Sequence, residues 1–183
     1  MESSDIRNDL TEILVTEEQI NTKLRQLAAQ IDADYAGKDL LLVGVLKGAV
    51  MVMADLSRAL TQHVQIDWMA VSSYGASTKS SGVVQIRKDL DTDIAGRHVL
   101  IVEDIIDSGL TLSWLLDNFA ARGAASIEVC ALLRKPEAAK VEIDCRYVGF
   151  DIPNDFVVGY GLDFAERYRN LRDVAVLAPH VYA

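Results

Sequence analysis

Three carboxylates and a turn of small residues follow one another in the segment H-V-L-I-V-E-D-I-I-D-S-G-L-T, residues 98–111. The carboxylates are Glu103, Asp104 and Asp107, and the turn is Ser108, Gly109, Leu110 and Thr111. Carboxylate oxygens bind Mg²⁺ or sugar hydroxyls, whereas free backbone N–H groups at a turn that opens a helix bind phosphate. A phosphorylated ribose carrying Mg²⁺ would use both halves of such a site.

The elements on either side of these residues are expected to hold them in place. Val99–Val102 are four apolar, β-forming residues, which is typical of a buried strand. Apolar residues with helical spacing follow the turn from Leu112 to Ala120, and Gly123 would end that helix. We therefore expect an α/β fold, with the carboxylates and the turn placed where a strand passes into a helix.

Composition narrows the class of protein. The chain has 183 residues, half of them hydrophobic and a quarter charged, which predicts one soluble globular domain. A net charge of −9 without a basic block argues against nucleic acid or an anionic membrane as partner. Cys130 and Cys145 lack metal-site spacing, and no apolar run approaches the roughly 20 residues of a membrane span. We expect a cytoplasmic protein with reduced thiols.

Segment 98–111 resembles the phosphoribosyl-pyrophosphate (PRPP) signature of the type I phosphoribosyltransferases. Its E-D-I-I-D-S-G form is similar to the 6-oxopurine branch, the hypoxanthine-guanine phosphoribosyltransferases. The resemblance implies a central, mostly parallel sheet flanked by helices, a small base-binding hood, and Mg²⁺ as cofactor. It also implies that residues 108–111 hold the 5′-phosphate, and that Glu103 and Asp104 bind the ribose diol and Mg²⁺. Asp107 is our candidate general base for the purine proton.

Lys47 and Gly48 separate a predicted strand, Leu40–Val45, from a predicted helix. An ordinary strand-to-helix turn would explain the glycine, while a lysine between two apolar runs fits better if its ammonium meets an anion. The L-K-G sequence resembles the pyrophosphate-binding loop of the family. That resemblance implies a cis peptide between Leu46 and Lys47.

Residues 73–82 are small or polar, with Tyr74 as the single aromatic residue. The pattern fits a solvated hairpin loop, and it also fits a lid that closes over a site and excludes water. It is similar to the flexible catalytic loop of the family, in which Ser73 and Tyr74 would be the contact residues.

Lys135 follows a predicted strand, Ser126–Leu133, and precedes Pro136, which stops strand pairing. The carboxyl end of such a strand faces the ligand crevice in an open α/β sheet. Lys135 is therefore either a solvated loop residue or a ligand-binding residue. The pair resembles the K-P of the family, whose ammonium binds the 6-oxygen of the purine.

The stretch V-G-F-D-I-P-N-D-F-V-V-G-Y-G-L-D, residues 148–163, is rich in glycine and aromatic residues. A small hairpin would have a similar composition, but this sequence is similar to that of the base-binding hood of the family. By that resemblance Phe156 stacks on the purine, and the main chain at Val157 and Asp163 faces its 2-position. The Asp163 side chain would join a second Mg²⁺ through water, and Arg169 would contact pyrophosphate.

We expect one domain, residues 1–183. Its core would comprise residues of about 35–145 and 172–178, and its hood the N-terminal lead-in and residues of about 146–171. Thr16 and Gln19 fit a capping box before a helix, and residues 179–183 are interpreted as a tail. The resemblance favours a homodimer or homotetramer.

The implied reaction transfers the phosphoribosyl group of PRPP to N9 of hypoxanthine or guanine, giving IMP or GMP and pyrophosphate. Two rivals remain at this point. A PRPP-sensing regulator without catalysis would lack the hood residues or carry a basic surface. A flavodoxin-like response regulator would need neither lid nor hood, and fold likeness alone does not separate it.

Overall fold

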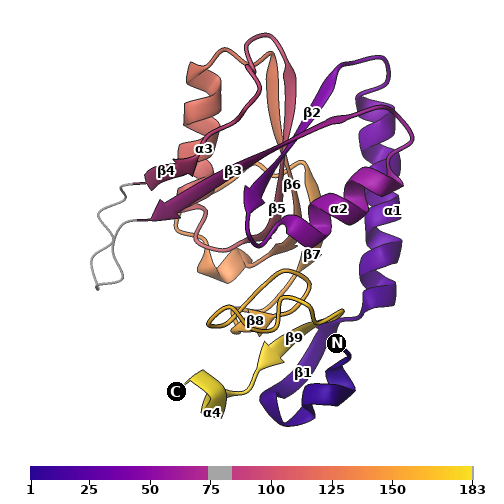
Figure 1. The fold of residues 1–183 in the computed structure, drawn as a ribbon, viewed down its shortest axis with the longest axis vertical. Helices are drawn as coiled ribbons and strands as arrows, with labels where there is room; N and C mark the ends of the chain where they lie inside the picture. Colours follow the sequence, from indigo (N-terminus) through magenta and orange to yellow (C-terminus); the bar gives the residue numbers. More distant parts are fainter. Residues whose placement is uncertain (74–83, 183) are drawn as a thin grey trace.

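The computed structural model describes residues 1–73 and 84–182, and its largest feature is a six-stranded sheet with helices on both faces (Figure 1). The strand order is β4-β3-β2-β5-β6-β7. Only the pair β3 and β4 is antiparallel, so the predicted mostly parallel sheet is confirmed. The bounds are β2 Leu40–Leu46, β3 Gln65–Ser73, β4 Val84–Lys88, β5 His98–Ile106, β6 Ser126–Arg134 and β7 Tyr147–Asp151.

Both faces of the central strands are buried. In β5, Leu100 and Val102 belong to the hydrophobic cluster beneath α1 (Glu17–Asp34) and α2 (Val50–Ala59). Val99 and Ile101 belong to the cluster beneath α3 (Leu110–Ala121) on the other face. Helices on both sides explain why residues 99–102 of this strand are all apolar, instead of alternating with polar residues.

The first long helix begins at its predicted cap. The Gln19 backbone N–H donates to Thr16 Oγ1 at 3.3 Å, and the Thr16 N–H donates to Gln19 Oε1 at 2.8 Å. Both bonds satisfy donors that the first helical turn would otherwise leave unpaired. Ile20, Leu24 and Ile31 then lie on the buried face of α1, which fixes the helix against the sheet.

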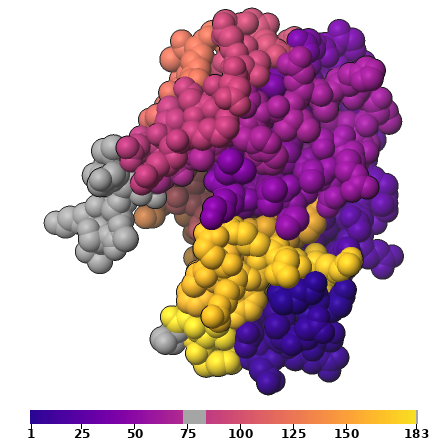
Figure 2. All heavy atoms as spheres, in the orientation of Figure 1, coloured from indigo at the N-terminus to yellow at the C-terminus, as the bar shows by residue number. Residues whose placement is uncertain are grey.

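A second, three-stranded antiparallel sheet has the order β1-β9-β8, with bounds Leu10–Val15, Val174–Leu177 and Val157–Val158. Residues 172–178, which the sequence analysis placed in the core, contain β9, and β9 pairs here with β1 and β8. Residues 147–151, expected in the hood, instead pair in parallel with β6. Figure 2 shows the indigo N-terminal and yellow C-terminal segments together at one end of the molecule.

Three short helical segments complete the described structure. Residues Ser3–Asp9 form the 3₁₀ helix η1, and Pro136–Ala138 form the 3₁₀ helix η2 beyond β6. Pro179–Tyr182, interpreted from the sequence as a tail, form the short helix α4. In the part of the chain that the structure describes, no helix combines the length and the apolar character that crossing a membrane requires.

Candidate active site

The predicted phosphate turn lines a hollow at the end of β5. Glu103, Asp107, Ser108, Gly109 and Thr111 all contribute to its wall, together with apolar neighbours. Gly109 has φ +79° and precedes the first residue of α3, a backbone conformation that favours glycine. This arrangement leaves the amino end of α3 free to receive an anion.

Leu110 is the one predicted member of the turn that does not line this hollow. Its side chain is 38% exposed, and it is the first residue of α3. Its backbone N–H lies 3.4 Å from Ser108 Oγ. A role for Leu110 would thus come from its main chain and not from its side chain.

Glu103 and Asp104 are consecutive in β5 and so point to opposite faces of the sheet. Glu103 lines the hollow of the phosphate turn, whereas Asp104 lies against Gly48, where a Cβ would overlap its carboxylate. Burial raises the pKa of Glu103 well above its usual range, and the nearby charge of Asp104 adds to the effect. Burial also raises the pKa of Asp104, to about 6. Both carboxylates therefore favour a cationic or hydroxylic ligand that would stabilise their charge.

The Lys47–Gly48 turn of the core contacts the loop that follows β8. The peptide between Leu46 and Lys47 is cis, as the resemblance implied. A Cβ on Gly161 would overlap the carbonyl of Gly48, so the two backbones are in close contact. Glycine at position 161 permits this approach, while glycine at position 48 leaves room for the Asp104 carboxylate.

Arg169 contacts two residues of the loop that follows β8. Its Nη1 donates to the carbonyl oxygen of Gly161 at 2.7 Å, and its Nη2 lies 2.8 Å from Asp163 Oδ1. Arg169 and Asp163 also act electrostatically on the pKa of Asp104. The structure thus brings together Lys47, Gly48, Asp104, Asp163 and Arg169, which the sequence placed in four separate segments.

Glu166 is a member of this group that the sequence analysis missed. Its Oε2 lies 3.1 Å from Lys47 Nζ, and its Oε1 lies 3.3 Å from Arg169 Nη2. The hydrogen bonds from Lys47 and Arg169 lower the pKa of Glu166. Its backbone has φ +62°, and its N–H donates to Asp163 Oδ2 at 2.8 Å. No sequence signal distinguishes such a carboxylate from an exposed one.

Lys135 lies at the carboxyl end of β6 and is only 8% exposed. Its backbone N–H donates to the carbonyl oxygen of Ile106 at 2.9 Å. Ile106 lines both the hollow beside Lys135 and the hollow of the phosphate turn, so the two are adjacent. Within the described residues, the Lys135 ammonium has no hydrogen bond or ion pair. The hollow is also lined by Arg134, which pairs with Asp151, and by Glu142. The unpaired ammonium of Lys135 is suited to an acceptor on a planar ligand.

Phe156 and Val157, two further predicted base-binding residues, lie at and beside the small sheet. Phe156 directly precedes β8 and is 42% exposed, while Val157 is buried and pairs with Val176 of β9. Ser73 is the last residue of β3. Tyr74, with the rest of the predicted flexible loop, lies outside the described residues.

The described carboxylates can be compared with the ligands that Mg²⁺ takes in proteins. No three His, Cys, Asp or Glu side chains within residues 1–73 and 84–182 gather closely enough to hold one ion. Mg²⁺ is commonly held by one or two carboxylates together with water and substrate phosphates. Glu103 beside the phosphate turn and Asp104 near Asp163 fit an ion that arrives with a phosphorylated substrate. The three carboxylates do not form a cage of their own.

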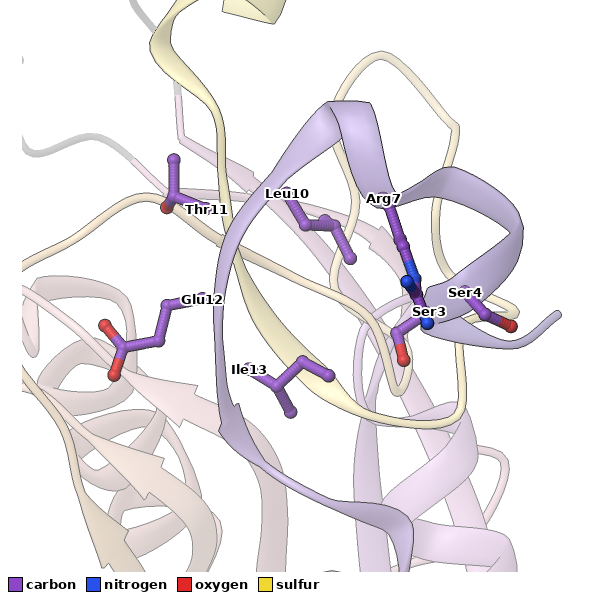
Figure 3. Close-up of a pocket in the computed structure, with 7 residues that line it drawn as sticks. All are labelled: Ser3, Ser4, Arg7, Leu10, Thr11, Glu12 and Ile13. Carbon is purple, nitrogen blue, oxygen red and sulfur yellow. The ribbon is translucent and has the colours of Figure 1, made fainter.

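The hollow in Figure 3 is a separate feature of the N-terminal segment. Its seven labelled residues all come from η1 and β1. It contains none of the predicted site residues, and so it is not the candidate active site.

Comparison with known proteins agrees with this geometry. Residues 11–165 match the model of the phosphoribosyl transferase domain family. The chain is 57% identical over 180 residues to a hypoxanthine-guanine phosphoribosyltransferase of Mycobacterium tuberculosis, covering 95% of this chain and 89% of that protein. It is 51% identical over 177 residues to the Bacillus subtilis protein of the same name, covering 97% and 98%.

A solved structure supports the same assignment. The fold matches a crystal structure of a hypoxanthine phosphoribosyltransferase from Staphylococcus aureus with a TM-score of 0.94 and 47% identity. The match covers 98% of this chain and 97% of that one. By sequence and by fold, this chain belongs to the phosphoribosyltransferase family, in its hypoxanthine-guanine branch.

Proposed function

We propose that the chain transfers the 5-phosphoribosyl group of PRPP to N9 of hypoxanthine or guanine, releasing pyrophosphate and giving IMP or GMP in purine salvage. The observation that carries the choice of base is Lys135, which is only 8% exposed, has no side-chain partner in the described part of the chain, and lines a hollow adjoining the phosphate turn. The relatives are enzymes by name, and they offer no support for a PRPP-sensing regulator.

In this proposal the turn Ser108–Thr111 binds the 5′-phosphate through its backbone N–H groups and the amino end of α3. Glu103 and Asp104 accept hydrogen bonds from the ribose hydroxyls. Lys47, the backbone at Gly48 and Arg169 bind the pyrophosphate. These groups hold the two substrates in line, which replaces a bimolecular encounter by a prearranged one.

The reaction breaks the bond between ribose C1′ and the pyrophosphate oxygen while N9 of the purine bonds to C1′. Positive charge develops on the ribose ring, as in glycoside cleavage, and negative charge develops on pyrophosphate, where Lys47 and Arg169 would stabilise it. Mg²⁺, when bound, would neutralise part of the phosphate charge. Asp107 would accept the proton that the purine loses, at N7.

Lys135 would determine the choice of base. Its N–H donors match the 6-oxygen of hypoxanthine and guanine, which accepts hydrogen bonds. The 6-amino group of adenine is itself a donor, so the two groups cannot pair. Binding adenine would leave a buried ammonium without an acceptor, which sites of this kind reject strongly. Phe156 would stack on the ring, and the main chain at Val157 and Asp163 would face its 2-position.

Several finer points belong to the same proposal. Residues 73–82 would form the lid, with Ser73 and Tyr74 as its contacts. The family resemblance favours a homodimer or homotetramer. Free thiols at Cys130 and Cys145 are compatible with the cytoplasm.

Pyrophosphate release is the direct test. Purified protein is given PRPP and Mg²⁺ with hypoxanthine, guanine, xanthine or adenine in parallel reactions. We expect release with hypoxanthine and guanine and none with adenine. Binding of PRPP without release from any base would favour the regulator, and turnover of adenine would contradict the role of Lys135.

A further inference from the structure

Three aromatic side chains form a cluster on the small sheet. The Phe156 ring is stacked on Tyr182 of α4, with 5.1 Å between centroids and 28° between planes. Phe164 meets Phe156 edge to face, with 5.8 Å between centroids and 88° between planes. We infer that Tyr182 is a positioning residue for the purine, which it orients by covering one face of the Phe156 ring. The inference rests on the proposed function.

The sequence around Tyr182 anchors it at this place. The Leu177 N–H donates to the Phe156 carbonyl oxygen at 2.9 Å, so the end of β9 is fixed beside Phe156. Ala178 N–H donates to the carbonyl oxygen of Asp9 at 2.7 Å. Val181 then packs against the cluster formed by Val158, Tyr168 and Leu177. These contacts fix α4 on two sides, so that the Tyr182 side chain lies on the Phe156 ring.

Phe156 is 42% exposed, so its own backbone does little to fix the orientation of its ring. A Phe side chain has two faces, and a base can stack on a face that is both free and correctly oriented. Tyr182 occupies one face and Phe164 restrains the ring from a second direction. The remaining surface of Phe156 is then preorganised for one planar ligand, which lowers the ordering cost of binding. The sequence could not show this, because Tyr182 and Phe156 lie far apart along the chain.

Replacing Tyr182 tests the inference through the two Michaelis constants. Tyr182→Leu keeps apolar volume but removes the aromatic face, whereas Tyr182→Phe keeps the ring and removes the hydroxyl. We expect Tyr182→Leu to raise KM for hypoxanthine about twofold to tenfold, the range that an aromatic pair contributes. KM for PRPP should stay within about twofold of the wild type by the same scale, and Tyr182→Phe should restore the wild-type KM for hypoxanthine.

His180→Ala is the matched control, since His180 is an exposed residue of the same helix. Each variant must unfold near the wild-type temperature, and Tyr182→Ser replaces Tyr182→Leu if the latter does not fold. An unchanged KM for hypoxanthine, or an equal rise in both constants, overturns the inference while leaving the proposed function intact. A wild-type protein that does not turn over purines overturns both.

Discussion

The ammonium of Lys47 lies 3.1 Å from the carboxylate of Glu166, in a pair that joins the turn after β2 to the loop before β9. Glu166 also contacts Arg169, so one carboxylate engages both cations assigned to pyrophosphate. Pyrophosphate and Glu166 would therefore compete for the same donors. The lowered pKa of Glu166 keeps this competitor charged at neutral pH.

Glu166→Gln should improve binding of PRPP, because it removes the competing charge and leaves Lys47 and Arg169 free. Exposed ion pairs are weak, so we expect KM for PRPP to fall by no more than about fivefold. The difference should shrink at high salt, which screens exposed charges. Glu18→Gln, the same change at an exposed position of α1, is the control. A rise in KM would mean that Glu166 helps to hold the site open.

Lys135→Ala should weaken the binding of 6-oxopurines and reduce the discrimination against adenine. Losing a hydrogen bond from a charged donor costs about 1.5–3 kcal/mol, so kcat/KM for hypoxanthine should fall about 10-fold to 100-fold. The measurement is kcat/KM for hypoxanthine and for adenine, with Lys140→Ala as an exposed control nearby. Unchanged exclusion of adenine would show that another group selects the base.

Asp107→Asn should retain PRPP binding but slow the transfer, since an amide cannot take the purine proton. General-base catalysis is worth roughly 10²–10⁴-fold, and the fall should lie in kcat. Single-turnover rates, with PRPP affinity measured by calorimetry, separate the two effects. The side chain is exposed and lines the phosphate hollow, so stability should hardly change. Wild-type turnover in this variant would remove Asp107 from the mechanism.

The raised pKa of Asp104 predicts a pH dependence of PRPP binding. With a pKa of about 6, the carboxylate is charged above that pH and protonated below it. Only the charged form attracts Mg²⁺ strongly, so the affinity for PRPP with Mg²⁺ should fall as pH drops through about 6. Calorimetric titrations from about pH 5 to about pH 7, roughly one unit on either side of the midpoint, measure this change in affinity. Asp104→Asn should bind weakly with little dependence across that range.

Much of this architecture could be predicted because its signals are local. The apolar run before Glu103, the Thr16 cap and the helical spacing after Gly109 each fix one element through neighbouring residues. Short strands are different, because Val174–Leu177 is equally apolar whichever sheet it joins. Its placement depends on pairing with Leu10–Val15, which no local pattern encodes.

The same distinction holds for the site. Residues of the resembling motifs could be named as candidates from the sequence, since each motif carries its own spacing. Glu166 and Tyr182 were missed because their roles come from contacts across the fold, to Lys47 and to Phe156. A carboxylate in a loop and a tyrosine at the chain end have no distinctive sequence context.

The small sheet joins the two ends of the chain, with Leu10 opposite Leu177 and Val15 opposite Val174. Strands so distant in sequence close a long loop, and contacts of this kind form late in folding. During synthesis the core can begin to fold once β7 is made, but β1 must wait for β9, which is made later. The nascent protein would thus carry its phosphate turn before its purine-binding surface exists. Activity would begin only after β9 has paired with β1.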